Sequence, residues 1–141
     1  MEDKVVSALV ERTRNEGFSR LLGMEVVEAA PGRAVARMQV DQRHTNVFGM
    51  VHGGAIFSLL DEAFQVACNA HGQIAVALQV SVNYLAPVRP GVSLGAELTE
   101  LNRTRRTGLY QARVWSEPGG DVAVGQALAW VVGRALPFVE E

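Results

Sequence analysis

Residues 53–84 read GGAIFSLLDEAFQVACNAHGQIAVALQVSVNY, and within them one periodicity replaces another. At 100° per residue, the apolar residues of the first half fall on one broad arc, which predicts a helix from about Gly53 to Ala70. Gly72 suits the end of a helix, and beyond it large apolar residues alternate with small or polar ones, which predicts a strand over residues 74–84. The apolar arc consists of Ile56, Leu59, Leu60, Ala63, Phe64, Val66 and Ala67. The opposite arc consists of Ser58, Asp61, Glu62, Gln65 and Asn69.

The flanking segments add a short helix and more strands. Residues 2–15 gather their valines and leucine on one face, which predicts an amphipathic helix. Consecutive strands joined by short turns run antiparallel. The order therefore predicts an α+β domain, with one long helix covering a face of an antiparallel sheet. The additional strands are expected near residues 24–30, 34–40, 92–101, 107–116 and 121–133.

The length and the charge balance limit the class of protein. The chain has 141 residues, of which 48% are hydrophobic, and a net charge of −2. We expect one domain over residues 1–141, with the helix at about 2–15 and a core over about 20–134. Because no basic excess exists, a nucleic-acid partner is not expected. Any anionic ligand must instead meet a local basic cluster.

Cysteine and histidine are scarce. Cys68 is the only cysteine, which excludes a disulfide within one chain, and His44, His52 and His71 lack the spacing of metal ligands. We therefore expect neither a metal nor another cofactor. No signal-peptide pattern and no run of 18 uncharged apolar residues is present, so we expect a soluble, cytoplasmic protein without a membrane partner.

The segment NVFGMVHGG, residues 46–54, stands where the long helix is predicted to begin. The first N–H groups of a helix lack an intrahelical acceptor and lie at the positive end of its dipole. Gly53 and Gly54 leave this backbone open to a ligand oxygen, so the segment is suited to stabilising an oxyanion. Alternatively, the glycines only permit a tight turn into the helix.

Asp61 is the candidate base or nucleophile, although a carboxylate on the polar arc beside Glu62 can also simply face water. Gly53 lies eight residues earlier, which on a straight helix means roughly 12 Å along the axis and about 80° around it. One helix therefore hardly brings both groups to one carbon atom. If both act, we expect a two-fold dimer in which Gly53 of one subunit faces Asp61 of the other.

The combined pattern N-x-x-G-x-x-H-G-G followed by the helical Asp resembles the acyl-CoA thioesterases of the hotdog fold, in particular the phenylacetic-acid-degradation (PaaI-type) subfamily. The resemblance extends from about residue 23 to residue 132. It implies a long central helix wrapped by a curved antiparallel sheet, dimerisation through adjoining sheets, and often a homotetramer. The pattern consists of Asn46, Gly49, His52, Gly53, Gly54 and Asp61, with the additional segments Asn83-Tyr84-Leu85-x-Pro87 and Arg103-x-x-Arg106-Thr107-x-x-x-Tyr110.

The resemblance implies hydrolysis of an acyl-CoA thioester, with an aromatic or medium-chain acyl group, to a free acid and CoA. The Gly53 N–H would polarise the thioester carbonyl, and Asp61 of the partner subunit would attack the carbonyl carbon or activate a water. Asn46 would hydrogen-bond the water or the thioester, and His52 would support the loop or contact the carbonyl region. Phe48, Phe57, Leu60 and Phe64 are candidates for the acyl pocket, and each is equally well explained as core.

CoA is polyanionic, and the densest cationic cluster of the chain is Arg103, Arg105 and Arg106. These arginines can contact phosphate or form a solvated hairpin tip. The resemblance favours Gly54, Arg103, Arg106 and Thr107 as the groups that bind substrate or CoA.

One departure from the family pattern concerns residues 77–81, ALQVS, where related enzymes often place a Ser or Thr that assists the carboxylate. Two further functions stay open. The domain could bind acyl-CoA without catalysis, or it could hydrate or dehydrate an acyl thioester. A binding module has no need of a carboxylate at the thioester, and a dehydratase needs a catalytic His with an acidic partner.

Overall fold

The computed structural model describes residues 2–139, and its elements follow the sequence pattern closely. The predicted domain of residues 1–141 includes residues 1, 140 and 141, which lie outside the described residues. The N-terminal half contains α1 (Glu2–Arg14), α2 (Gly17–Leu22), β1 (Met24–Ala30), β2 (Arg33–Gln39), the 3-10 turn η1 (Gln42–His44) and α3 (Gly53–Asn69). The C-terminal half contains β3 (Gln73–Tyr84), β4 (Ser93–Arg103), β5 (Thr107–Glu117) and β6 (Asp121–Ala135).

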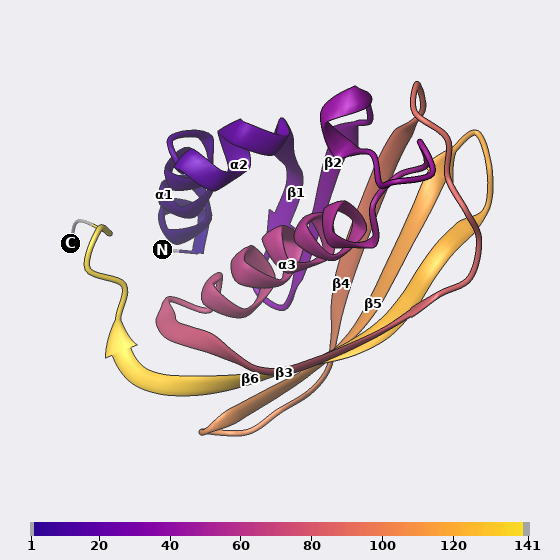
Figure 1. The fold of residues 1–141 in the computed structure, drawn as a ribbon. Helices are drawn as coiled ribbons and strands as arrows, with labels where there is room; N and C mark the ends of the chain where they lie inside the picture. The colour runs from indigo at the N-terminus through magenta and orange to yellow at the C-terminus, as the bar shows by residue number, and fades with distance from the viewer. Residues whose placement is uncertain (1, 140–141) are drawn as a thin grey trace.

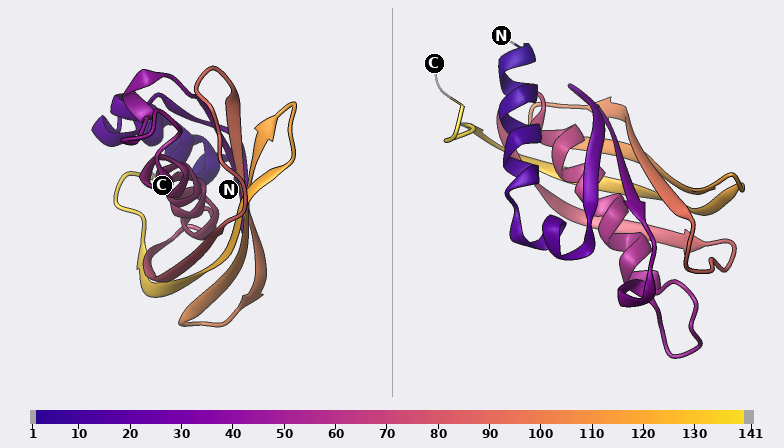
Figure 2. Two further views of the ribbon diagram at one scale, coloured as in Figure 1. Left: turned by 45° about the vertical axis from the view of Figure 1, so that its right-hand side comes forward. Right: turned by 90° about the horizontal axis from the view of Figure 1, so that it is seen from above.

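The six strands form one antiparallel sheet in the order β1-β2-β4-β5-β6-β3. The sheet curves around α3, as Figures 1 and 2 show from three directions. This arrangement confirms the predicted α+β hotdog architecture, with a long central helix and a short N-terminal helix. Strands β3 and β4 run antiparallel, as expected, but β3 pairs with β6 and lies at the edge of the sheet.

The apolar arc of α3 forms the core, as predicted. Leu59, Leu60, Ala63 and Phe64 are buried against the concave face of the sheet. The Phe64 ring meets the Tyr110 ring edge-on, with 5.5 Å between the ring centroids. Helix α3 is therefore fixed along its whole length by the strands beneath it, and its start and its polar stripe are held in defined positions.

Two residues of the predicted polar arc of α3 are buried. Glu62 and Asn69 are buried, with only 4% and 8% of their surfaces exposed. Glu62 lies beside Ser19 of α2, and Asn69 forms hydrogen bonds with both backbone groups of Ala75 in β3. Because elements pack on the flanks of α3 as well as under it, its buried face is wider than the apolar arc.

Helix α2 was not predicted from the pattern. It has six residues, too few for a helical period to show, and it ends at Gly23, whose φ of 73° is the left-handed conformation that glycine adopts readily. Its side chains Phe18 and Leu21 are exposed. Over residues 2–139, no helix combines the length and the apolar character that a membrane crossing requires.

Candidate active site

The loop before α3 is held together by Asn46. Its Oδ1 atom accepts hydrogen bonds from the N–H groups of Phe48 (2.9 Å) and Met50 (3.2 Å). Gly49 takes a φ of 74°, which permits the tight turn between them. The Asn46 Nδ2 group forms no hydrogen bond with the described residues, so it remains able to donate to a ligand.

His52 is the N-cap of α3. Its Nδ1 atom accepts a hydrogen bond from the Gly54 N–H at 2.8 Å, and its carbonyl oxygen accepts from the N–H groups of Ala55 and Ile56. The Gly54 N–H is therefore engaged within the protein. The Gly53 N–H, by contrast, has no hydrogen-bond acceptor among residues 2–139. One backbone donor at the positive end of the helix is thus available to a ligand.

Tyr84, at the end of β3, covers Gly53. Its hydroxyl donates a hydrogen bond to the Gly53 carbonyl oxygen at 3.1 Å. A Cβ atom on Gly53 would lie 3.3 Å from the Cζ atom of this ring, which is tighter than usual contact. The close approach therefore favours glycine at this position. Tyr84 was not among the predicted site residues, because only the fold brings the end of β3 to the start of α3.

A hollow of about 450 Å³ lies beside Gly53. The loop before α3, the first turn of the helix and residues 84–88 line it, and Asn46, Phe48 and Tyr84 are among its walls. Its size falls in the range of about 300–1,000 Å³ that is usual for small-molecule pockets. His52 and Gly54 instead line a smaller hollow of about 200 Å³ next to α2.

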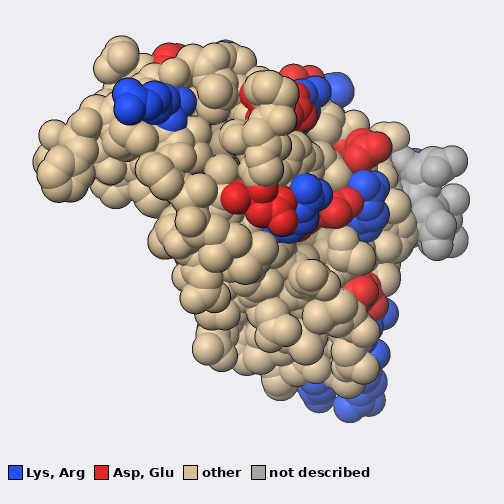
Figure 3. Space-filling model, turned by 90° about the vertical axis from the view of Figure 1, so that its right-hand side faces the viewer, with Lys and Arg blue, Asp and Glu red and all other residues tan. Residues whose placement is uncertain are grey.

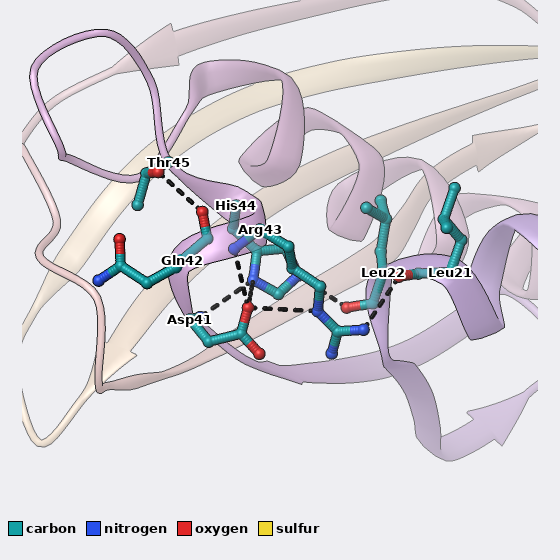
Figure 4. Close-up of polar contacts among 7 residues, drawn as sticks. All are labelled: Leu21, Leu22, Asp41, Gln42, Arg43, His44 and Thr45. Carbon is teal, nitrogen blue, oxygen red and sulfur yellow. Dashed lines mark hydrogen bonds and ion pairs between the residues drawn. The ribbon is translucent and has the colours of Figure 1, made fainter.

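His44 anchors the segment that leads to the loop (Figure 4). It is buried, its Nδ1 atom accepts from the Asp41 N–H at 3.0 Å, and its Nε2 atom is 2.7 Å from the Leu22 carbonyl oxygen. Its own carbonyl oxygen accepts a hydrogen bond from the His52 N–H at 2.7 Å. Because both ring nitrogens are engaged within the protein, His44 is a structural histidine that positions His52.

Asp61 lies more than two turns beyond Gly53 on α3. Its side chain is exposed and forms no hydrogen bond with the described residues. Partial burial, and secondarily the negative charge of Glu16, raise the pKa of Asp61 above its usual value. Asp61 does not line the hollow at Gly53. Within one chain, the structure therefore brings Asn46 to Gly53 but leaves the carboxylate apart from them.

The predicted CoA-binding arginines lie at the tip of the β4–β5 hairpin. Arg103, Arg105 and Arg106 are exposed, and the Arg106 guanidinium lies 5.8 Å from the centroid of the Trp130 ring. The Thr107 hydroxyl is 2.8 Å from the Thr104 hydroxyl and helps to shape the turn. In Figure 3, basic side chains gather at the lower edge of the molecule, where Figure 1 places this hairpin.

The proposed acyl-pocket residues separate into two groups. Leu60 and Phe64 are fully buried in the core, where they cannot line an open pocket. Phe48 is 85% exposed and lines the hollow at Gly53, and Phe57 is partly buried. A larger groove of about 880 Å³ runs between α1, the second half of α3 and residues 136–138, and it contains none of the predicted site residues.

Comparison with known proteins identifies the family. The model of the Thioesterase superfamily matches residues 48–123. The acyl-coenzyme A thioesterase PaaI of Escherichia coli is 30% identical over 122 residues, which cover 86% of this chain and 87% of PaaI. Human acyl-coenzyme A thioesterase 13 is 34% identical over 82 residues, which cover 56% of this chain and 59% of that protein.

Solved structures agree with the sequence matches. The structure of E. coli PaaI, from the phenylacetic acid degradation operon, superimposes with a TM-score of 0.89 at 28% identity and covers 95% of this chain and 97% of PaaI. The structure of smu.793 from Streptococcus mutans, bound to acetyl CoA, has a TM-score of 0.76 at 26% identity and covers 80% of this chain and 91% of that protein. The family match over more than half of the residues shows that this chain is a member of the Thioesterase superfamily.

Proposed function

We propose that this protein hydrolyses acyl-CoA thioesters to a free acid and CoA, with an aromatic or medium-chain acyl group. The observation that carries the proposal is the unpaired Gly53 N–H, which stands at the start of α3 beside a hollow of about 450 Å³. Two relatives are named acyl-CoA thioesterases, and smu.793 was solved with acetyl CoA bound. The origin of PaaI in a phenylacetic acid operon supports an aromatic acyl group.

The chemistry requires a donor for the thioester carbonyl oxygen, which gains negative charge as the carbon becomes tetrahedral. The Gly53 N–H is fixed by the helix and lies at the positive end of its dipole, so it stabilises this charge without reorganisation. The free Nδ2 group of Asn46, on the same hollow, donates to the attacking water or to the thioester. His52 accepts the Gly54 N–H, so these two residues fix the first turn of the helix.

The second component is a carboxylate that attacks the carbonyl carbon or takes a proton from water. Asp61 is exposed and its pKa is raised, which brings a carboxylate toward the range of a useful base. Since Asp61 does not line the hollow at Gly53, the carboxylate that completes this site comes from a second copy of the chain. Each pair of subunits then contains two equivalent sites.

The edge strand β3 supports such a dimer. It has twelve residues with one side unpaired, and Val76 and Leu78 are about half exposed on it. The unpaired N–H and C=O groups of such an edge can pair with a strand of another chain. Because α3 runs back along β3, antiparallel pairing of two β3 strands about a two-fold axis also makes the two α3 helices antiparallel. The start of one α3 then approaches the middle of the other, and a dimer of dimers completes the proposed homotetramer.

The phosphates of CoA are proposed to lie against Arg103, Arg106 and Thr107. The hairpin tip presents two exposed guanidinium groups, whose fork of donors suits phosphate. Stacking on Trp130 limits the freedom of Arg106, so that less side-chain entropy is lost when a phosphate binds.

A thiol-release assay with acetyl-, hexanoyl-, palmitoyl-, benzoyl- and phenylacetyl-CoA tests the activity. We expect CoA release to be fastest with an aromatic or medium-chain ester. Release from none of these esters would refute the proposal. In that case, tight binding by calorimetry would indicate a non-catalytic acyl-CoA-binding module, and water addition to an enoyl-CoA would indicate a hydratase.

Subunit exchange tests the shared site. A Gly53→Val variant, whose side chain would displace Tyr84, and an Asp61→Asn variant are each expected to be inactive. Their mixed dimers contain one site in which both residues are intact, so activity should return on exchange. Mass spectrometry of differently labelled subunits establishes that mixed dimers form, and mixtures of each variant with itself are the controls. Mixed dimers without activity would refute a composite site.

A further inference from the structure

Glu62, the residue after Asp61, is a buried carboxyl group with an unsatisfied oxygen. Only 4% of its surface is exposed. Its Oε1 atom accepts a hydrogen bond from the Gln65 side chain at 3.0 Å, whereas Oε2 is buried and has no partner among the described residues. A buried carboxylate with a bare oxygen is costly unless that oxygen carries a proton.

Gln65 connects Glu62 to a second carboxyl group. Its Nε2 atom donates to Glu62 at 3.0 Å and to Glu16, the N-cap of α2, also at 3.0 Å. A side-chain amide has two N–H donors, so it satisfies one oxygen on each carboxylate and no more. The same Nε2 atom therefore bridges the Glu16 and Glu62 carboxyl groups and places them next to each other. One oxygen of each carboxyl group receives no hydrogen from Gln65, and a single proton held between the two groups would satisfy both.

Several acidic groups surround Glu62, and Arg12 lines the same groove as Glu16. Glu16 and Ser19 face Glu62 from the start of α2, and Asp61 and Gln65 face it from α3. The Ser19 hydroxyl donates to the Met24 carbonyl oxygen at 3.0 Å, and none of the ion pairs within residues 2–139 includes Glu16, Asp61 or Glu62. The pKa of Glu62 is raised to about 7, chiefly by burial and further by Glu16 and Asp61, against the lowering effect of Ser19.

We propose that Glu16 and Glu62 share one proton, and that this carboxyl pair is a positioning element for Asp61. The proton is covalently bound to one carboxyl group and donated to a carboxylate oxygen of the other. The pair docks the start of α2 on α3 and limits the charge facing Asp61 to a single negative charge. Glu16 also lines the groove of about 880 Å³, which gives the shared proton a path to water.

The consequence for Asp61 rests on the proposed function. A carboxylate must be ionised to attack a carbonyl carbon or to accept a proton from water. If Glu62 were also ionised in the acidic range where Asp61 titrates, a second negative charge would oppose ionisation of Asp61 and reduce the active fraction there. The shared proton therefore keeps Asp61 available for ionisation, while burial and the one remaining charge of the pair keep the pKa of Asp61 above its ordinary value.

The first experiment needs no substrate. In protein labelled with 13C at glutamate carboxyl carbons, one resonance should titrate with a midpoint near the pKa of about 7 and should be absent from Glu62→Gln. The raised pKa means that Glu62 stabilises the fold at low pH and that this contribution is lost between the ordinary value of 4.5 and about 7. The melting temperature of the wild type should therefore fall relative to Glu62→Gln over this window. The exposed Glu25→Gln is the matched control and should parallel the wild type. If every glutamate titrates below about pH 5.5, as ordinary glutamates do, the shared proton is refuted.

The second experiment concerns the acid limb of kcat/KM against pH. Burial is the main cause of the raised pKa of Asp61 and the Glu16 charge is the second, so Glu16→Gln removes the second cause and the limb should move to lower pH. In Glu62→Gln, a neutral amide replaces a carboxyl group that is already protonated over the acid limb. The acid limb of this variant should therefore coincide with that of the wild type. A shift in Glu62→Gln as large as that in Glu16→Gln would refute the proposal. If no thioester is hydrolysed, the proposed function fails, and the titration still decides whether the carboxyl pair exists.

Discussion

The two ends of α3 differ in whether their polar groups are hydrogen-bonded. At the start, the Gly53 N–H has no acceptor among the residues that the structure describes, and a hollow lies beside it. At the end, Asn69 is buried and binds Ala75 twice: its Oδ1 atom accepts from the Ala75 N–H at 2.9 Å, and its Nδ2 group donates to the Ala75 carbonyl oxygen at 3.0 Å. Beyond it, His71 Nε2 is 2.6 Å from a carboxylate oxygen of Glu100.

The start of α3 is therefore suited to binding a ligand, and the end of α3 is suited to stabilising the fold. A donor that water can reach costs little when it is left unpaired, and it can then bind a substrate oxygen. A buried polar group without a partner costs about 1–3 kcal/mol, so the closed end must be fully bonded. Substitutions at the open end should therefore change activity, and substitutions at the closed end should change the free energy of unfolding.

The largest effect is expected for Asp61→Asn, on the open half of the helix. The amide can neither accept a proton from water nor attack a carbonyl carbon, so kcat should fall about 10²- to 10⁴-fold, the usual contribution of a catalytic base. Because the carboxylate is exposed, urea unfolding should show no loss of stability. Thiol release under saturating acyl-CoA measures the change, and a variant with full activity would exclude Asp61 from the mechanism.

Asn69→Ala tests the closed end. It leaves the N–H and the carbonyl of Ala75 without partners in a buried site, so the free energy of unfolding should fall by about 2–4 kcal/mol. Urea denaturation measures the loss, and kcat per folded molecule should stay close to that of the wild type. A large loss of kcat in folded Asn69→Ala would show that the ends are not independent.

Much of the fold could be predicted because its signals are local. The change of period between residues 53–69 and 73–84 predicted α3 and β3 correctly, and the turn residues predicted the remaining strands. The burial of Glu62 and Asn69 could not be predicted in this way. An apolar arc describes only the helix itself, whereas α2 and β3 cover the flanks of α3 and provide hydrogen-bonding partners there.

The candidate site shows the same division. A helix that begins at two glycines predicts a free N–H, and the structure leaves the Gly53 N–H without an acceptor. The cover of Tyr84 over Gly53 and the support of His52 by His44 depend on residues far apart or on buried loop geometry. Such contacts carry no periodic signal, so only the folded chain reveals them.

His52→Ala tests the start of α3 by removing the side chain that caps it. The loss of the N-cap leaves the Gly54 N–H without its acceptor, which should lower the free energy of unfolding by about 1 kcal/mol. Because the Gly53 N–H remains, kcat should fall far less than in Asp61→Asn. Thermal unfolding measures the change, and His52→Asn, which restores a good N-cap, should recover most of the stability. A loss in His52→Ala as large as in Asn69→Ala would mean that both ends are structural.

The smallest effect is expected away from both ends, at the hairpin tip. Exposed charges contribute little, about 0–1 kcal/mol each, so Arg103→Ala combined with Arg106→Ala should raise KM for a CoA ester by only a few-fold, with kcat unchanged. KM for the same acyl group on N-acetylcysteamine, which lacks the phosphates, should not move. Arg105→Ala is the matched control from the same turn and should behave like the wild type. An equal rise in KM for both thiol carriers would mean that the tip acts on the acyl site through the fold, because only a contact with phosphate distinguishes the two substrates.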